Sequence, residues 1–108
     1  MKNHPVHVRI AEDKLKLGKS EYSIAVGKGD TITWTLDCGG AAHFAVLLPS
    51  FHSPLTWCCK AKKGKVIKGK VRKSALPGVY PYGLCVFDGA RLRVLDPDII
   101  VTPPKGGR

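Results

Sequence analysis

Apolar and polar residues alternate along most of this 108-residue chain, which is the pattern of strands that bury one face. Ile32, Trp34 and Leu36, for example, alternate with threonines, so these three side chains are predicted to point into the core. No long segment follows the helical period. The pattern predicts an all-β fold, an antiparallel sandwich or small barrel of about seven or eight strands. The expected strands are residues 6–10, 15–17, 22–26, 31–36, 43–48, 66–75, 79–87, 92–95 and 99–101.

Two segments depart from simple alternation. Residues 43–48 are apolar on both faces, which predicts a central strand that is covered on both sides. Residues 50–63 follow neither period and predict the longest irregular stretch, a kind of loop that is often functional. The chain length predicts one domain, residues 1–102, followed by a frayed tail of residues 103–108.

The charge balance is strongly basic, with 18 Lys and Arg against 8 Asp and Glu and a net charge of +10. Such a charge favours acidic partners, whether protein, lipid or nucleic acid. Eight basic residues and no acid lie between positions 60 and 73, which makes this segment a candidate polyanion-binding surface: Lys60, Lys62, Lys63, Lys65, Lys68, Lys70, Arg72 and Lys73. The segment lacks the interleaved aromatic residues of single-strand binders, which argues against nucleic acid. An edge strand that its lysines protect from aggregation is the alternative.

Motifs of enzymes and of membrane spans are missing from the sequence. It contains no GxSxG, P-loop, GxGxxG or HExxH pattern, so no enzymatic activity is predicted. No stretch approaches the roughly 20 apolar residues of a membrane-spanning helix. The first five residues lack the apolar core of a signal peptide, so we expect either that the chain is not exported or that a signal was removed.

Four cysteines leave several states open. They permit three fully paired connectivities in an oxidising compartment, and free thiols or a metal site otherwise. A disulfide from Cys38 to Cys58 or Cys59 would join two loops that a sandwich can place at one end. Zinc is not favoured because no CxxC spacing occurs.

Four stretches of sequence form a recognisable series. They are residues 29–34 (GDTITW), His43 at the head of an apolar strand, residues 77–82 (PGVYPY) leading to Cys85, and residues 96–101 (DPDIIV). Their order and spacing resemble the cupredoxins, the Greek-key β-sandwich family of blue-copper proteins, and the last stretch resembles bacterial cupredoxin-like proteins in particular. The resemblance implies a Greek-key sandwich and a periplasmic or other extracytoplasmic location.

The resemblance also implies a type 1 copper site, held by a His, a Cys, a second His about three residues later and an axial Met. His43 and Cys85 fall on the first two ligand positions. Asp88 stands where the second His is expected, the only methionine begins the chain, and two arginines occupy the axial region. The family's standard site is therefore not expected to form.

These observations predict a non-enzymatic, cupredoxin-like binding or structural module without a cofactor. One alternative is a small electron-transfer or copper-binding protein with an altered site, in which His43 and Cys85 are joined by Asp88, His52 or another cysteine. A second alternative is a basic domain for nucleic acid or another polyanion. Cys85 itself is expected to be a small buried apolar residue, unless it ligates copper or forms a disulfide.

Overall fold

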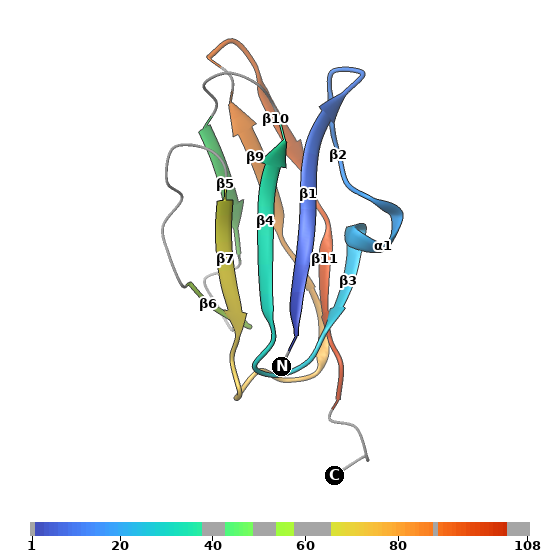
Figure 1. Cartoon of the computed structure of the whole chain (residues 1–108), viewed down its shortest axis with the longest axis vertical. Coiled ribbons are helices and arrows are strands. Elements are labelled where there is room, and N and C mark those ends of the chain that lie inside the picture. Colours follow the sequence, from blue (N-terminus) through green and yellow to red (C-terminus); the bar gives the residue numbers. More distant parts are fainter. Residues whose placement is uncertain (1, 38–42, 49–53, 58–65, 88, 104–108) are drawn as a thin grey trace.

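The computed structural model of the chain is almost entirely β-structure (Figure 1). It describes residues 2–37, 43–48, 54–57, 66–87 and 89–103, and of Ser20, Thr56 and Trp57 only the backbone. The predicted all-β class is confirmed, with more and shorter strands than expected. The described elements are β1 (Asn3–Ala11), β2 (Lys14–Lys16), α1 (Lys19–Tyr22), β3 (Ser23–Val26), β4 (Thr31–Asp37), β5 (His43–Leu47), β6 (Leu55–Trp57), β7 (Val66–Val71), β8 (Gly78–Pro81), β9 (Gly83–Phe87), β10 (Leu92–Leu95) and β11 (Asp98–Val101).

The strands form the two layers of a sandwich. The first layer is a five-stranded sheet in the order β2-β1-β4-β7-β6. The second layer contains two three-stranded sheets, β10-β9-β5 and β3-β11-β8. The chain passes directly between these two sheets, from β8 to β9 at Tyr82 and from β10 to β11 through Asp96 and Pro97. Figure 1 shows β1, β4 and β7 in front of β9, β10 and β11. The predicted sandwich is confirmed, whereas its Greek-key connectivity stays a prediction.

Two of the strand pairs are parallel. β1 runs parallel to β4, with Val6 opposite Trp34, and β11 runs parallel to β3, with Ile99 opposite Ile24. The expectation of a purely antiparallel sandwich is therefore wrong at these pairs. Alternation along a strand reports which face is buried and carries no information on the direction of its neighbour.

The inward faces of both layers meet in one apolar core. Ile32, Trp34 and Leu36 on β4 are buried, as their alternation predicted, and Leu84 and Val86 on β9 face them from the second layer. Burial of such side chains is the main favourable contribution to folding. The threonines that alternate with them lie on the outer face of the first layer.

Two predicted strand positions are corrected. β5 pairs only with β9 among the described strands, so it is an edge strand, and His43 and Leu47 on it are exposed. An unbroken apolar run thus marks a strand with an apolar outer face as well as a strand covered on both sides. β7 lies between β4 and β6, which makes the edge-strand explanation of its lysines wrong.

Local differences from the prediction have local causes. β6 lies within the stretch expected to be irregular, where three residues are too few to show alternation. Tyr22 belongs to the single helical turn α1 and not to the strand that follows. The segment predicted as one strand over residues 79–87 is divided at Tyr82, whose backbone N–H donates to the carbonyl of Pro97 (2.9 Å). The predicted frayed tail lies outside the described residues except for Pro103, and the domain limits stay a prediction.

Candidate binding surfaces

The outer face of the β10-β9-β5 sheet is apolar, and we call it the apolar face. Strand register aligns two outward positions of β9 with outward positions of both neighbours: Leu92, Phe87 and His43 form one row, and Val94, Cys85 and Ala45 the next. Gly83 and Leu47 continue the pattern. The four large apolar side chains of this face, Leu47, Phe87, Leu92 and Val94, are between 40% and 63% exposed. Contiguous exposed apolar surface of this kind marks an interaction site more often than isolated exposed residues do.

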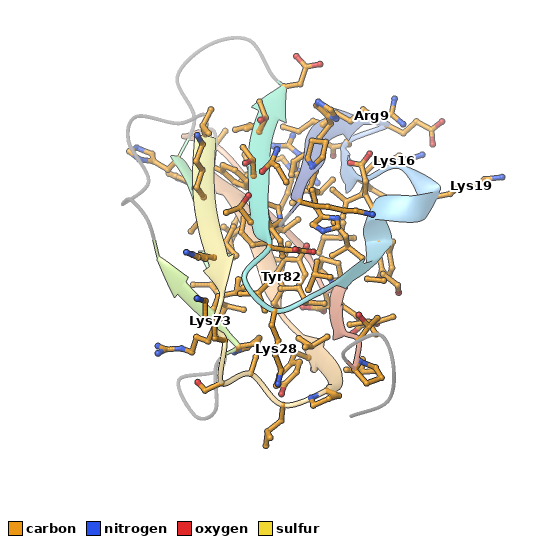
Figure 2. The ribbon with its side chains drawn as sticks, turned by 60° about the horizontal axis from the view of Figure 1, so that its bottom comes forward. Arg9, Lys16, Lys19, Lys28, Lys73 and Tyr82 are labelled. Carbon is orange, nitrogen blue, oxygen red and sulfur yellow. The ribbon has the colours of Figure 1, made fainter. Side chains whose placement is uncertain are left out.

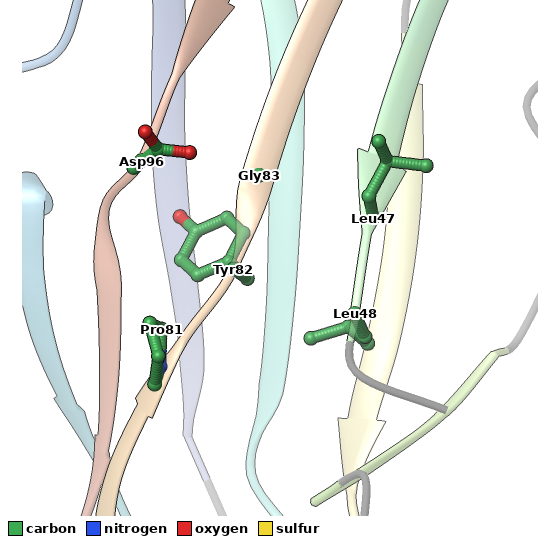
Figure 3. A pocket seen from close by; sticks show the side chains of 6 residues that line it. All are labelled: Leu47, Leu48, Pro81, Tyr82, Gly83 and Asp96. Atoms are coloured by element: carbon green, nitrogen blue, oxygen red, sulfur yellow. The ribbon is translucent and has the colours of Figure 1, made fainter. Parts of the chain in front are cut away.

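A shallow groove continues the apolar face at the lower end of β5 (Figure 3). It is an open space of about 380 Å³ at the point where β8 bends into β9. Figure 3 shows two leucines on one side and Pro81, Tyr82 and Asp96 on the other. The lining residues are Leu47, Leu48, Pro81, Tyr82, Gly83 and Asp96. Because Leu47 belongs to both features, the groove and the apolar face form one surface.

The two candidate copper ligands lie on this apolar face, at diagonal positions. His43 is directly opposite Phe87, and Cys85 is directly opposite Ala45. The His43 ring stacks on Phe87, with ring centroids 6.4 Å apart and an interplanar angle of 26°. Diagonal residues on a sheet are separated by about 7 to 8 Å, a distance that an imidazole and a thiolate can span to one ion, so the register of His43 and Cys85 leaves the altered copper site a prediction. In the described part of the chain, no group of three His, Cys, Asp or Glu residues is placed to hold a metal.

The other cysteine predictions divide into two groups. Cys85 is a half-buried free thiol on an outward position, so the expectations of a fully buried residue and of a disulfide at Cys85 are both wrong. The candidate disulfide of Cys38 with Cys58 or Cys59 lies outside the described residues and stays a prediction. Asp88 and His52 also lie outside the described residues.

The two arginines of the expected axial region are engaged elsewhere. Arg91 and Arg93 both form ion pairs with Asp13, which lies in the turn between β1 and β2. The Arg93 guanidinium donates to Asp13 Oδ1 at 2.7 Å. Asp13 has a positive φ of 67°, a conformation that Asp tolerates better than most residues. The two ion pairs therefore join β10 of one layer to the β1–β2 turn of the other.

The basic segment predicted between positions 60 and 73 is described only in part. Lys68 and Lys70 point outward from β7, and Arg72 and Lys73 follow in the turn after it; all four are exposed. Lys60, Lys62, Lys63 and Lys65 lie outside the described residues. The four described members divide between the outer face of the first layer and the end of the sandwich.

Asp30 holds together the end of the sandwich at which β1 begins. It is 8% exposed, and it accepts hydrogen bonds from the backbone N–H groups of Gly27 (2.9 Å) and Lys2 (3.1 Å). Its Oδ2 also lies 2.8 Å from Nε2 of His4. Burial acts to raise the pKa of Asp30, but the hydrogen bonds from His4, Gly27 and Lys2 outweigh burial and lower this pKa to about 2. Asp30 thus ties the start of β1 to the β3–β4 turn.

The fold is that of an all-β sandwich protein, and the similarity to known proteins that we report below is a similarity of fold alone. No family model and no curated protein matches the sequence. The structure is similar to the crystal structure of a cysteine protease inhibitor from Entamoeba histolytica, with a TM-score of 0.57 and 11% sequence identity. The similarity covers 94% of this chain and 96% of that chain. No helix in the described residues is long and apolar enough to cross a membrane.

The sequence prediction missed the apolar face. Alternation in residues 92–95 predicts a strand, and by the usual rule its apolar members point inward. In the structure Arg93 points toward the β1–β2 turn and Leu92 and Val94 point outward. The sequence did contain one sign of the apolar face, the unbroken apolar run of residues 43–48. A strand with one buried face needs only every second residue of such a run for the core, so the others are left on its outer face.

Proposed function

We propose that this protein is a non-enzymatic binding module that holds an acidic protein on its apolar face. The observation that carries the proposal is the row-by-row alignment of exposed apolar side chains on β10, β9 and β5. A protein partner with a matching apolar patch would remove this surface from water, which favours association in proportion to the area buried.

The charge of the chain supports an acidic partner over a second copy. Two copies would each carry +10 and repel one another, whereas an acidic protein would be attracted during encounter. The neighbouring fold in Entamoeba histolytica is described as an inhibitor and not as an enzyme, which supports a role for such a sandwich in binding proteins.

The variants add positive charge to different faces, two charges on the apolar face and one on the control face. Leu92→Lys with Val94→Lys changes two exposed side chains of the apolar face, and Val66→Lys changes an exposed side chain on the outer face of the other layer. We expect the wild-type protein and Val66→Lys to capture the same acidic protein from an extract of the source cells, and the double variant to lose it. The captured protein is then purified and titrated against all three chains, with an expected loss of at least about tenfold in affinity for the double variant.

The thiol of Cys85 reports directly on whether the partner occupies the face. Cys85 lies between Ala45 and Val94, so a partner seated there would shield it from alkylation. Slower alkylation of the Cys85 peptide in the reconstituted complex, measured by mass spectrometry, is the expected result. Unchanged alkylation, or equal affinity of the double variant, would refute the proposed surface.

A second candidate function is inhibition of a cysteine protease. The favouring observation is that the fold similarity to the Entamoeba histolytica inhibitor extends over almost the whole of both chains. Titration of papain with the protein tests this function: a stoichiometric fall in peptidase activity would support it. Full activity at a large excess of the protein would exclude inhibition of this enzyme. The Leu92→Lys, Val94→Lys variant shows whether inhibition and the apolar face are the same property.

A further inference from the structure

Exposed basic residues gather at the end of the sandwich that carries the start of β1, the β3–β4 turn and the turn after β7 (Figure 1). We call it the basal end, and its described segments are residues 2–4, 26–31, 70–79 and 101–103. The exposed cations of these segments are Lys2, Lys28, Lys70, Arg72 and Lys73. Figure 2 shows Lys28 and Lys73 extending from this end, while Arg9, Lys16 and Lys19 lie elsewhere on the molecule.

Backbone hydrogen bonds hold these basic segments together. Gly29 N–H donates to the carbonyl of Val71 (3.0 Å), and Val71 N–H donates back to the carbonyl of Asp30 (2.8 Å). Thr31 N–H donates to the carbonyl of Lys2 (2.8 Å). Segments that are far apart in the sequence thus present their cations from one fixed backbone frame, so little order has to be created when an anion binds.

The negative charge of the basal end is turned inward. Asp30 is the only acidic residue in the described basal segments, and it is buried against His4 and the N–H groups of Gly27 and Lys2. Its carboxylate holds the turns in place, whereas the surrounding basic side chains point into solvent. In these described segments, the charged side chains that reach solvent are therefore all positive.

Two strongly exposed apolar side chains stand beside these cations. Leu76 is 69% exposed and Val79 is 62% exposed. The loop that carries Leu76 is anchored, because the Tyr80 hydroxyl donates to the carbonyl of Leu76 (2.6 Å). Ala75 N–H donates to the carbonyl of Arg72 (3.0 Å), which connects this apolar loop to the basic turn. Gly78, between Leu76 and Val79, turns the chain at a φ of 157°, a conformation that residues with a Cβ rarely adopt.

We propose that the basal end docks on an anionic lipid bilayer, with Leu76 and Val79 entering the interface and the five cations facing the headgroups. A bilayer surface supplies both partners at once, since anionic headgroups attract basic residues and the acyl boundary accepts apolar ones. The phosphate backbone of a nucleic acid would use the cations alone and leave Leu76 in water. This surface is separate from the apolar face, so the inference goes beyond the proposed function and can succeed or fail independently of it.

Sedimentation with lipid vesicles tests the proposal. We expect the wild-type protein to bind vesicles of phosphatidylcholine mixed with phosphatidylserine and to bind vesicles of pure phosphatidylcholine much more weakly. Lys28→Glu with Lys73→Glu should weaken binding by more than about 25-fold, since each basic residue at such a surface contributes about fivefold to partitioning. The control is Lys14→Glu with Lys19→Glu, which makes the same change in net charge at exposed sites away from the basal end.

The apolar contribution is tested separately. Leu76→Ser should weaken vesicle binding by about tenfold, as expected for an exposed leucine that becomes partly buried. It should also remove the part of the binding that persists at high salt. Circular dichroism and thermal unfolding check that each variant keeps the fold, which is expected because the substituted side chains are exposed.

The alternatives give different results. Equal weakening by the Lys28, Lys73 pair and by the Lys14, Lys19 control would mean that only net charge matters, and would overturn the basal end as a docking surface. Binding of a DNA duplex that depends on Lys28 and Lys73, together with vesicle binding that does not depend on Leu76, would overturn the bilayer in favour of nucleic acid.

Discussion

The indole N–H of Trp34 donates a 3.0 Å hydrogen bond to the hydroxyl of Tyr82, so the two layers of the sandwich are joined by a polar contact inside the core. The rings also meet edge to face, with centroids 5.6 Å apart and an interplanar angle of 63°. Trp34 lies on β4 of the first layer, and Tyr82 lies at the bend between β8 and β9 of the second. Both side chains are buried. The contact therefore fixes where the second layer bends and hence where the apolar face ends.

Substitution of either ring is expected to destabilise the fold by different amounts. Trp34→Ala should lower the free energy of unfolding by about 3 to 5 kcal/mol, the usual cost of removing a large buried aromatic side chain. Tyr82→Phe keeps the packing and removes only the hydrogen-bond acceptor, so it should cost about 1 to 2 kcal/mol. Urea unfolding monitored by fluorescence and circular dichroism measures both. A cost below about 1 kcal/mol for Trp34→Ala would contradict the register of β4.

Alkaline pH is expected to weaken the same contact. Burial is the largest cause that raises the pKa of Tyr82 to about 12, and the nearby charges of Asp98 and Glu21 act in the same direction, although the bond from Trp34 opposes them. The folded state thus favours the neutral phenol, and its contribution to stability is complete below about pH 10 and is lost between about pH 10 and 12, with a size of about 3 kcal/mol. Unfolding titrations across this range should show a smaller loss for Tyr82→Phe than for the wild-type protein. Identical pH profiles would contradict a buried Tyr82 hydroxyl.

Acid pH is expected to act at Asp30. Because the pKa of Asp30 is lowered from 3.8 to about 2 in the folded protein, the carboxylate contributes stability above about pH 4, and this contribution is lost as the pH falls toward 2. The size is about 2 kcal/mol. Asp30→Asn should lose this amount at neutral pH and show a flatter acid branch of the stability curve. Asp37→Asn, at an exposed position, is the control and should leave the acid branch nearly unchanged.

The ion pairs of Asp13 are expected to contribute little to stability and more to local order. Asp13→Asn retains a residue that tolerates the positive φ of this turn but removes the charge that Arg91 and Arg93 share. Because Asp13 is half exposed, the cost in unfolding free energy should not exceed about 1 kcal/mol. Hydrogen exchange should nevertheless speed up in β10 relative to β9. If the substitution changes the exchange rates of β10 and β9 equally, the arginines do not hold β10.

The sequence was sufficient to predict most strands and their buried faces, but it was insufficient to predict the surfaces that neighbouring strands form together. Alternation around Trp34 placed β4 and its buried face correctly, because period two is a property of one strand alone. It could not place Cys85 next to Ala45 and Val94, or Lys2 next to the β3–β4 turn, because these neighbours depend on strand order. The apolar face and the basal end are both made by neighbours of this kind, so neither could be predicted from runs of residues.

The same limit applies to the predicted copper ligands. The resemblance to cupredoxins implied that His43 and Cys85 lie in one region of the fold, and both do lie on the β10-β9-β5 sheet. Spacing could not show that they would be diagonal and that the ring of Phe87 would lie against His43. The resemblance to cupredoxins itself stays a prediction, and so does the altered copper site that is its alternative.

Copper titration is the measurement that decides this alternative. Cu(II) added to the reduced protein should give no intense visible band, because a blue site needs a thiolate and two imidazoles in one trigonal set, and no histidine follows His52 in the sequence to serve as the second imidazole after Cys85. Cys85→Ser should leave the weak spectrum of any bound copper unchanged. Replacing Arg93 with Met to supply an axial thioether should also remove the hydrogen bond from residue 93 to Asp13 and so loosen β10. The double change Asp88→His with Arg93→Met supplies the missing imidazole and thioether, but it is expected to remain colourless because β10 loses its contact with Asp13. A wild-type protein that turns blue, and loses its colour in Cys85→Ser, would contradict this expectation and would make copper the function to pursue.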